Sequence, residues 1–506
     1  MRNLISRKSD TKYLLFLGMI AVVFFIIWRW IAVKAGITGY LTVDDIASVQ
    51  FALMGDSIPD KLKNIIIHEP TNVPIFYLLT YFWTELFGFS ANIMRLLPQI
   101  LGALFIIVTG RIGEKIYNKR VGIISAILVG SSLQLVYASY QVRAYSLMML
   151  FSAIVYYAWL CRDERKYSII KYALAMIVLC YSHFFGILIC AAFCSFDLLN
   201  VILKKEKSKI MTSYVILGCC FIPYLILAFL NVKNVWGNFW PPVPGFRDFF
   251  EMIWMLCPTA EITIYLFGSA FFVYLFIFID KIKNKEFLTK LYEEDAIFKK
   301  ELFVCFWNVF AVIIVVFLYS KYLNPTSSIW VYRYFLVLYP FVIAIIAWTL
   351  EMIFVWFEDK CNINKFVLLG CALFIGITYT YVNCCYQLDN WQEVTYGGVD
   401  FQKVTDYVMS RKDINEESTL VYFEYPEKYF EGWEKYASKD GELELPNLCC
   451  TKKEFFELDL TQYEKIYVIR AVYTFAEESS GYLMQTHQLM EQNCDGVEYV
   501  DCYIKQ

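Results

Sequence analysis

Long apolar runs separated by short basic clusters recur along most of this sequence. The first run, residues 13–33, has about the length needed to cross roughly 30 Å of hydrocarbon. Of the 506 residues, 58% are hydrophobic and only 18% are charged, which leaves more apolar surface than a soluble domain can bury. We therefore expect an α-helical protein that crosses a bilayer several times.

The basic clusters predict the orientation of the chain. A basic stretch at 2–12 precedes the first run, and no convincing cleavage site follows it, so we expect an uncleaved span with a cytoplasmic N-terminus. Lys and Arg then gather at 111–120, 162–171, 204–209, 281–300 and 360–365, the pattern of cytoplasmic loops. The spans between the clusters add up to about eleven, which predicts a multi-pass protein of the cell membrane with its C-terminus outside.

Two domains are expected. Residues 1–386 form the transmembrane domain, and its first outer loop, about 34–94, contains an apolar segment at 73–87 that is too short to cross. We expect interfacial helices in this loop. Residues 387–506 form a small soluble α/β domain outside the cell, because their apolar periodicity changes from that of spans to that of short strands.

The second domain should contain a helix over 400–409 and strands over 419–424, 465–470 and 497–504. It lacks a Gly-rich phosphate loop, which argues against a nucleotide site, and nothing in the chain resembles a nucleic-acid footprint. Most of the 16 cysteines lie in apolar runs, where they behave as small hydrophobes. A disulfide among Cys449, Cys450, Cys494 and Cys502 stays open.

Two adjacent carboxylates, Asp44 and Asp45, follow the first span. Such a pair at a water–membrane boundary suits a general base with an ionised partner, or the binding of a divalent cation such as Mg²⁺ or Mn²⁺. The alternative is structural, because Thr42 and Asp45 have the spacing of a capping box that begins a helix.

His68 and Glu69, with Pro70 behind them, lie in the same outer loop. The chain has only three histidines, and this one has the chemistry to bind phosphate, sugar or metal. A surface histidine ahead of a turn proline is the alternative.

Two arginines lie at outer ends of spans. Arg143 falls in the stretch 139–145, which ends in Tyr145, and Arg333 is followed by Tyr334. A guanidinium binds phosphate through two parallel hydrogen bonds, so either arginine is suited to a lipid phosphate. Snorkelling of the side chain to the interface is the alternative. For His183, at another outer turn, packing or interfacial anchoring is the favoured interpretation.

The order of these residues resembles glycosyltransferase family 39 of the GT-C superfamily, which includes protein O-mannosyltransferases and aminoarabinose transferases. The resemblance rests on the acidic pair, the His68 element, Arg95-Leu96-Leu97-Pro98, residues 139–145, and Arg333-Tyr334. Gln141 stands where the family often has Glu, and Glu69 interrupts a His-Pro-Pro element. These departures put a second acidic contributor and the phosphate site in doubt.

The resemblance implies transfer of a hexose or pentose from a polyprenyl-phosphate donor to a hydroxyl of a protein, lipid or cell-envelope glycan, outside the membrane and with inversion. Asp44 would be the base and Asp45 a catalytic partner or metal ligand. Substrate contacts would come from His68, Glu69, Arg143, Tyr145, Arg333 and Tyr334.

Two other classes of function fit parts of the pattern. A lipid-linked sugar flippase or transporter would also need outer arginines, but it would be expected to show two related halves with broken spans, and we find none. A scaffold without catalytic activity would leave the aspartates as helix caps only.

Overall fold

The structure is a computed structural model of the chain. It describes residues 2–34, 41–68, 73–162, 168–204, 209–232, 241–256, 300–360, 365–389, 404, 407, 410–411, 417–423, 448–449, 452–470, 477–494 and 500–506. The predicted basic loop 281–300 lies outside these residues except for its last position, and of the predicted helix 400–409 only residues 404 and 407 are described, both helical.

The contacts of the chain divide it into two compact units. The first comprises Met1–Ala35, Asp56–Leu79 and Arg95–Thr395. The second comprises Gly36–Gly55, Thr80–Met94 and Tyr396–Gln506, so it includes two segments of the first loop as well as the C-terminal part.

The first unit is built of apolar helices. Six described helices are long and apolar enough to cross a membrane, or seven if a bent pair counts as one span. The chain is thus a multi-pass membrane protein of helical class, as predicted, while the number eleven stays a prediction. The helices of this unit are α1 (Arg2–Lys34), α3 (Ile58–His68), α5 (Ala91–Ile116), α6 (Lys119–Gly130), α7 (Leu133–Tyr140), α8 (Tyr145–Leu160), α9 (Ser168–Ser182), α10 (Phe185–Lys204), α11 (Met211–Val232), α12 (Phe246–Met255), α15 (Lys300–Leu318), α16 (Tyr339–Lys360) and α17 (Lys365–Asp389).

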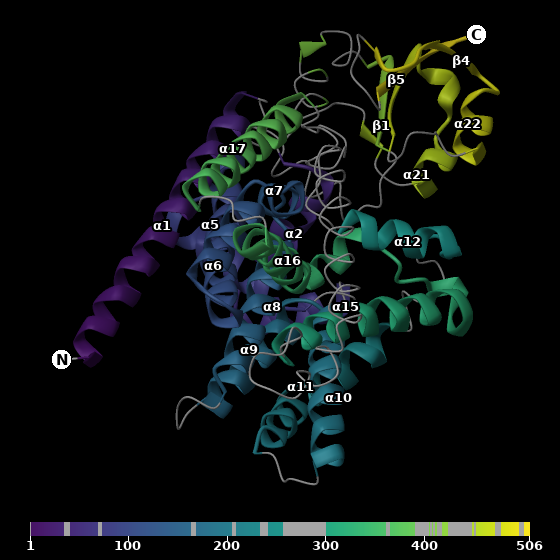
Figure 1. Ribbon diagram of the computed structural model, residues 1–506. Helices are drawn as coiled ribbons and strands as arrows, with labels where there is room; N and C mark the ends of the chain where they lie inside the picture. Colours follow the sequence, from purple (N-terminus) through teal and green to yellow (C-terminus); the bar gives the residue numbers. More distant parts are fainter. Residues whose placement is uncertain are drawn as a thin grey trace. The chain divides into compact units, whose positions relative to one another are not determined.

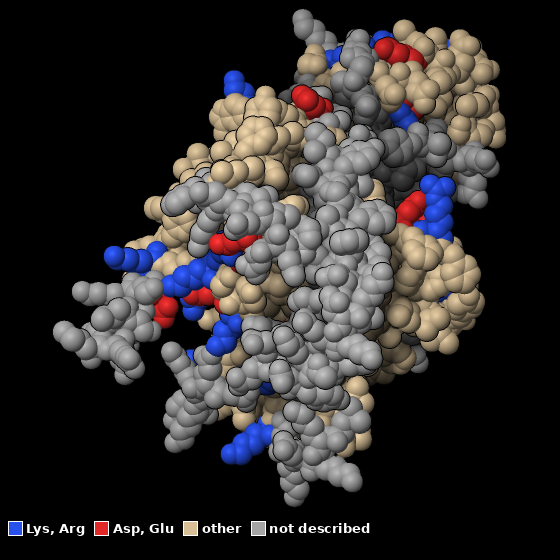
Figure 2. All heavy atoms as spheres, viewed as in Figure 1, with Lys and Arg blue, Asp and Glu red and all other residues tan. Residues whose placement is uncertain are grey.

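Charged side chains are sparse on this unit. On the face drawn in Figure 2, most of the described surface carries neither Lys and Arg nor Asp and Glu. Several leucine, isoleucine and valine side chains along α1, such as Leu15 and Val22, are more than half exposed. An apolar exposed face of this length is stable only against lipid.

The bent pair consists of α6 and α7, which meet at 56° around Ser131 and Ser132. A break inside a span frees backbone carbonyls, and each must find a new donor. Trp28 of α1 donates to the Gly130 carbonyl at 3.0 Å, and Gln387 of α17 donates to the Ser131 carbonyl at 3.4 Å. Helices α1 and α17 lie side by side in Figure 1, and together they support the break.

Small residues let neighbouring helices approach closely where α5 meets α6. A Cβ atom on Gly113 would lie 2.8 Å from the Cα atom of Gly122, and a Cβ atom on Gly122 would lie 2.0 Å from the Tyr13 hydroxyl. Such close approach is the usual way helices associate in lipid. It fixes the positions of α1, α5 and α6 relative to one another.

The first loop contains three short helices where interfacial helices are predicted. They are α2 (Val43–Leu53), α3, and α4 (Ile75–Phe87), which coincides with the apolar segment too short to cross. Polar residues and a glycine at positive φ, Gly88, end α4 before α5 begins.

The C-terminal part contains a five-stranded sheet in the order β2-β1-β3-β5-β4, which confirms the predicted small α/β domain. Strands β1 and β3 pair in parallel, whereas β5 runs antiparallel to both β3 and β4. The three predicted strands are confirmed to within three residues at each end. The elements are β1 (Thr419–Phe423), β2 (Leu448–Cys449), α21 (Lys452–Glu457), β3 (Lys465–Ile469), α22 (Glu477–Leu483), β4 (His487–Glu491) and β5 (Val500–Lys505).

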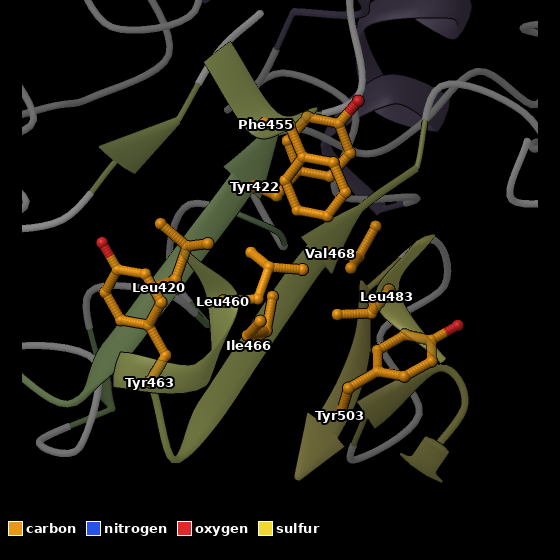
Figure 3. Packing of buried hydrophobic residues seen from close by; sticks show 9 residues of the cluster. All are labelled: Leu420, Tyr422, Phe455, Leu460, Tyr463, Ile466, Val468, Leu483 and Tyr503. Atoms are coloured by element: carbon orange, nitrogen blue, oxygen red, sulfur yellow. The ribbon is translucent and has the colours of Figure 1, made fainter. Parts of the chain in front are cut away.

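One face of this sheet carries the hydrophobic core of the domain (Figure 3). The rings of Tyr422 on β1 and Phe455 on α21 stack with their centroids 3.9 Å apart, and Leu483 of α22 is fully buried beside the sheet. Of the cysteines considered for a disulfide, Cys494 and Cys502 are both buried free thiols, and Cys450 lies outside the described residues.

Candidate functional site

The turn between α7 and α8 carries the predicted Arg143. It begins where Arg95, a buried residue of α5, donates a hydrogen bond to the carbonyl of Tyr140 at the C-terminal end of α7. A cation at this end of a helix satisfies a free carbonyl and complements the helix dipole. Gln141 is then buried, Arg143 is half-buried, and α8 starts at Tyr145.

Arg333 lies on the short 3-10 helix η4 (Tyr332–Leu338), ahead of α16. The hydroxyl of Ser152 on α8 donates to the Val337 carbonyl at 2.6 Å and ties η4 to that helix. The Arg333 side chain is only 9% exposed, and its guanidinium lies 5.9 Å from the centre of the Tyr145 ring. The two predicted substrate-binding residues of distant sequence segments are therefore neighbours.

His183 joins them from the turn between α9 and α10. Its ring lies 6.3 Å from the ring of Tyr145 and 4.9 Å from that of Tyr334. The backbone N–H of Phe185 donates to Nδ1 of His183 at 3.2 Å, so this nitrogen carries no proton and Nε2 bears the hydrogen of the neutral ring.

Burial first, and then the charges of Arg143 and Arg333, lower the pKa of His183 to about 3. The imidazole is therefore neutral at physiological pH and offers its Nε2–H as a donor. The dependence on both arginines also shows that Arg143 lies within electrostatic range of the same ring.

We call these five residues, Arg143, Tyr145, His183, Arg333 and Tyr334, the arginine–tyrosine cluster. They join two guanidinium groups, a neutral N–H donor and two phenol rings at the ends of apolar helices. Guanidinium groups favour a phosphate over other anions because their planar fork matches two of its oxygens. The arrangement has the chemistry to hold the phosphate of an amphiphile whose tail lies along the spans.

Two buried residues that the motifs did not indicate support the cluster. The Tyr137 hydroxyl is within hydrogen-bonding reach of Arg333 and of Gln141. Gln134, one turn earlier on α7, donates to the Met255 carbonyl at 2.9 Å, to which the Tyr332 hydroxyl also donates at 3.1 Å. These contacts anchor α12 to the start of η4.

The carboxylate pair lies at the start of α2, in the other compact unit. The capping box indicated by spacing is present, since the Thr42 N–H donates to Asp45 at 3.0 Å and the Asp45 N–H donates to the Thr42 hydroxyl at 3.3 Å. Asp45 is fully buried, whereas Asp44 is half-buried and its carbonyl accepts from Ser48. Asp44 is therefore the more accessible carboxylate of the two.

Two further predicted residues, His68 and Glu69, are neighbours in the first loop. His68 is the last residue of α3, and Glu69 lies outside the described residues. Among the residues that the structure describes, no group of three or more His, Cys, Asp and Glu side chains is placed to hold a metal ion. The buried Asp45 carboxylate already accepts from the helix cap, so we derive no step through a metal.

The sequence pattern of the dolichyl-phosphate-mannose-protein mannosyltransferase family matches residues 68–227, which contain Arg143, Tyr145 and His183. Comparison with curated protein sequences found no match.

Two solved structures of ArnT from Cupriavidus metallidurans resemble the fold over nearly the whole chain. The structure bound to undecaprenyl phosphate has a TM-score of 0.55 at 10% identity and covers 96% of this chain and 97% of that chain. The apo structure has a TM-score of 0.56 at 10% identity and covers 98% of each. The oligosaccharyltransferase AglB from Archaeoglobus fulgidus, in complex with an inhibitory peptide and a dolichol-phosphate, is more distant, with a TM-score of 0.42 at 11% identity over 87% of this chain and 62% of that chain.

The matched segment lies in the helical unit except for Thr80–Met94, and the likeness to ArnT covers 98% of the chain. Residues 68–227 thus match the dolichyl-phosphate-mannose-protein mannosyltransferase family, and the chain has a fold similar to that of ArnT.

Proposed function

We propose that this protein transfers a sugar from a polyprenyl-phosphate donor to a hydroxyl acceptor at the outer face of the membrane. The observation that carries the proposal is the arginine–tyrosine cluster, which gathers two guanidinium groups and a neutral histidine at the ends of apolar helices. The family match and the fold it shares with ArnT, whose structure holds undecaprenyl phosphate, support the same donor class.

Asp44 is the proposed base. In the reaction, the acceptor oxygen forms a bond to the anomeric carbon while the bond from that carbon to the phosphate oxygen breaks, and the acceptor proton passes to the Asp44 carboxylate. No second carboxylate is proposed as a nucleophile, so the anomeric configuration inverts.

Arg143 and Arg333 are the proposed phosphate contacts. The leaving polyprenyl phosphate gains negative charge as the bond breaks, and half-buried or buried guanidinium groups stabilise that charge more than water does. His183 adds one neutral N–H donor, and the Tyr145 and Tyr334 rings hold the arginine and histidine in place. His68, Glu69 and Asp45 remain proposed contacts to the substrate, with Asp45 the proposed ligand if a divalent cation takes part.

We place the N-terminus in the cytoplasm, residues 1–386 in the membrane domain and residues 387–506 outside, where the sheet domain would help select the acceptor. The acceptor hydroxyl belongs to a protein, a lipid or a cell-envelope glycan.

Binding of undecaprenyl phosphate to the purified full-length chain tests the cluster. Removal of a guanidinium that makes charge-assisted hydrogen bonds costs about 1.5–3 kcal/mol, so Arg143→Ala and Arg333→Ala should each weaken binding roughly ten- to hundredfold. Arg247→Ala is the matched control, because the Arg247 side chain is 90% exposed and pairs only with Glu251 among the described contacts. Equal affinities in all three variants would contradict the assignment.

A further inference from the structure

A cavity away from the arginine–tyrosine cluster opens where α1, α5 and α8 meet. Its volume is about 440 Å³, within the range of small-molecule sites. Leu14, Ile107 and Val108 form its apolar wall, and Asp10, Thr11, Arg111 and Tyr157 form its polar end. All of these residues belong to the first compact unit.

The polar end lies where two spans end. Asp10 begins the apolar span of α1, and Arg111 lies in the last two turns of the span of α5. Lipid headgroups occupy this depth of a bilayer, and acyl chains run inward from it. The apolar wall continues from the polar end along the same two helices, with Leu14 about half exposed.

The charges at this end are mixed. Arg111 pairs with Glu114 and donates to the Tyr157 hydroxyl at 3.3 Å, with its guanidinium 6.0 Å from the Tyr157 ring centre. Asp10 lies within electrostatic range of both Arg111 and Glu114. A guanidinium has five N–H donors, and the contacts with described residues engage two of its nitrogens.

We infer that this cavity binds one zwitterionic phospholipid whose headgroup carries a primary ammonium, with the phosphate on Arg111 and the ammonium on Asp10. A headgroup with net negative charge would leave the Asp10 carboxylate without a cation, and diacylglycerol would leave the charged end without a partner. A quaternary ammonium could not donate hydrogen bonds to the Asp10 carboxylate. The apolar wall would receive the first part of an acyl chain.

Native mass spectrometry of the purified full-length chain tests this inference with four probes: phosphatidylethanolamine, phosphatidylcholine, phosphatidylglycerol and diacylglycerol. The wild type should retain phosphatidylethanolamine most strongly. Arg111→Gln should lower that retention about tenfold, the value of one charge-assisted contact. Asp10→Asn should reduce the preference for phosphatidylethanolamine over phosphatidylglycerol about two- to fivefold, because Asp10 is exposed and its charge is screened.

Leu14→Trp fills the apolar part of the cavity without altering a charge, so it tests the site even if Arg111→Gln fails to fold. Its matched control is Val23→Trp, at an exposed position further along α1. Retention should fall in Leu14→Trp alone. Equal retention by these two variants, or a wild type that holds phosphatidylglycerol or diacylglycerol as firmly as phosphatidylethanolamine, would overturn the inference.

Discussion

The guanidinium of Arg333 lies over the ring of Tyr145, 5.9 Å from its centre, although 187 positions separate the two residues in the sequence. The contact joins η4 to the start of α8, and His183 reaches the same place from a third turn. A cation on an aromatic face keeps its charge while its planar group stays oriented. The contact therefore positions Arg333 for an anion.

Replacement of Arg333 by lysine separates charge from geometry. Lysine keeps the positive charge but lacks the planar fork that matches two phosphate oxygens. We expect Arg333→Lys to bind undecaprenyl phosphate about tenfold more weakly than the wild type and still more tightly than Arg333→Ala. If lysine restores full affinity, the site recognises charge alone.

Two substitutions at His183 separate its two ring nitrogens. His183→Asn retains an acceptor near the position of Nδ1 for the Phe185 N–H, and His183→Gln retains a donor near the position of Nε2. If Nε2–H contacts the phosphate, the Gln variant should keep more donor affinity than the Asn variant. The reverse order would assign His183 to the turn and not to the donor.

The depressed pKa of His183 also predicts a pH dependence of stability. The folded pKa is about 3, against about 6.5 in the unfolded chain, so only the unfolded chain takes up the proton between these values. The His183 contribution to the free energy of unfolding is full above pH 6.5 and falls as the pH drops towards 3. The melting temperature of the wild type should therefore fall more between pH 7.5 and 5 than that of His183→Asn, and parallel curves would exclude this assignment.

Glu351 of α16 forms a buried ionic contact with the start of α6. Its fully buried carboxylate accepts from Arg120 Nη2 at 2.6 Å and from Asn118 at 2.9 Å. Removal of Glu351 breaks these charge-assisted hydrogen bonds but leaves Arg120 34% exposed to solvent, so Glu351→Ala should lower stability by about 1.5–3 kcal/mol. The control is Glu358→Ala. The Glu358 carboxylate is partly exposed and lies 4.0 Å from Arg120, so its removal should lower the free energy of unfolding by about 1 kcal/mol or less. Thermal unfolding in detergent compares the two, and equal losses would argue against the contact.

The sheet core predicts a local effect in the C-terminal domain. Phe455 is fully buried against Tyr422, whereas its neighbour Phe456 is 37% exposed. Phe455→Ala should destabilise the sheet by about 3–5 kcal/mol, and Phe456→Ala should cost clearly less. Hydrogen exchange of the β1 and β3 amides measures this directly, and equal acceleration in both variants would contradict the packing.

Features that depend on neighbours in the sequence were predictable. Strands β1, β3 and β5 are short apolar runs bounded by polar residues, and each was located from that pattern alone. The capping box at Thr42 and Asp45 involves residues three positions apart, so its spacing revealed it. Strand β4 gave no such signal, because four of its five residues are exposed on an edge of the sheet.

Features that depend on distant residues were not predictable. His183 has an ordinary aromatic turn around it, and its place beside Arg333 follows only from the packing of η4 against α8 and α10. The bend between α6 and α7 needs donors from Trp28 and Gln387, more than 100 positions away on either side. Sequence motifs therefore predicted Arg143 and Arg333 as phosphate contacts, and the fold adds His183 and Tyr137 beside them.

Transfer of sugar from its lipid carrier tests the central claim most directly. Membranes containing the wild type, Asp44→Asn or Asp56→Asn would be supplied with polyprenyl-phosphate sugars extracted from a deletion strain, and the release of polyprenyl phosphate would be measured. Asp56 is an exposed carboxylate near α3 and serves as the matched control. We expect release with the wild type and Asp56→Asn and none with Asp44→Asn, whereas full release with Asp44→Asn would contradict the proposed base and no release with the wild type would contradict the proposed reaction.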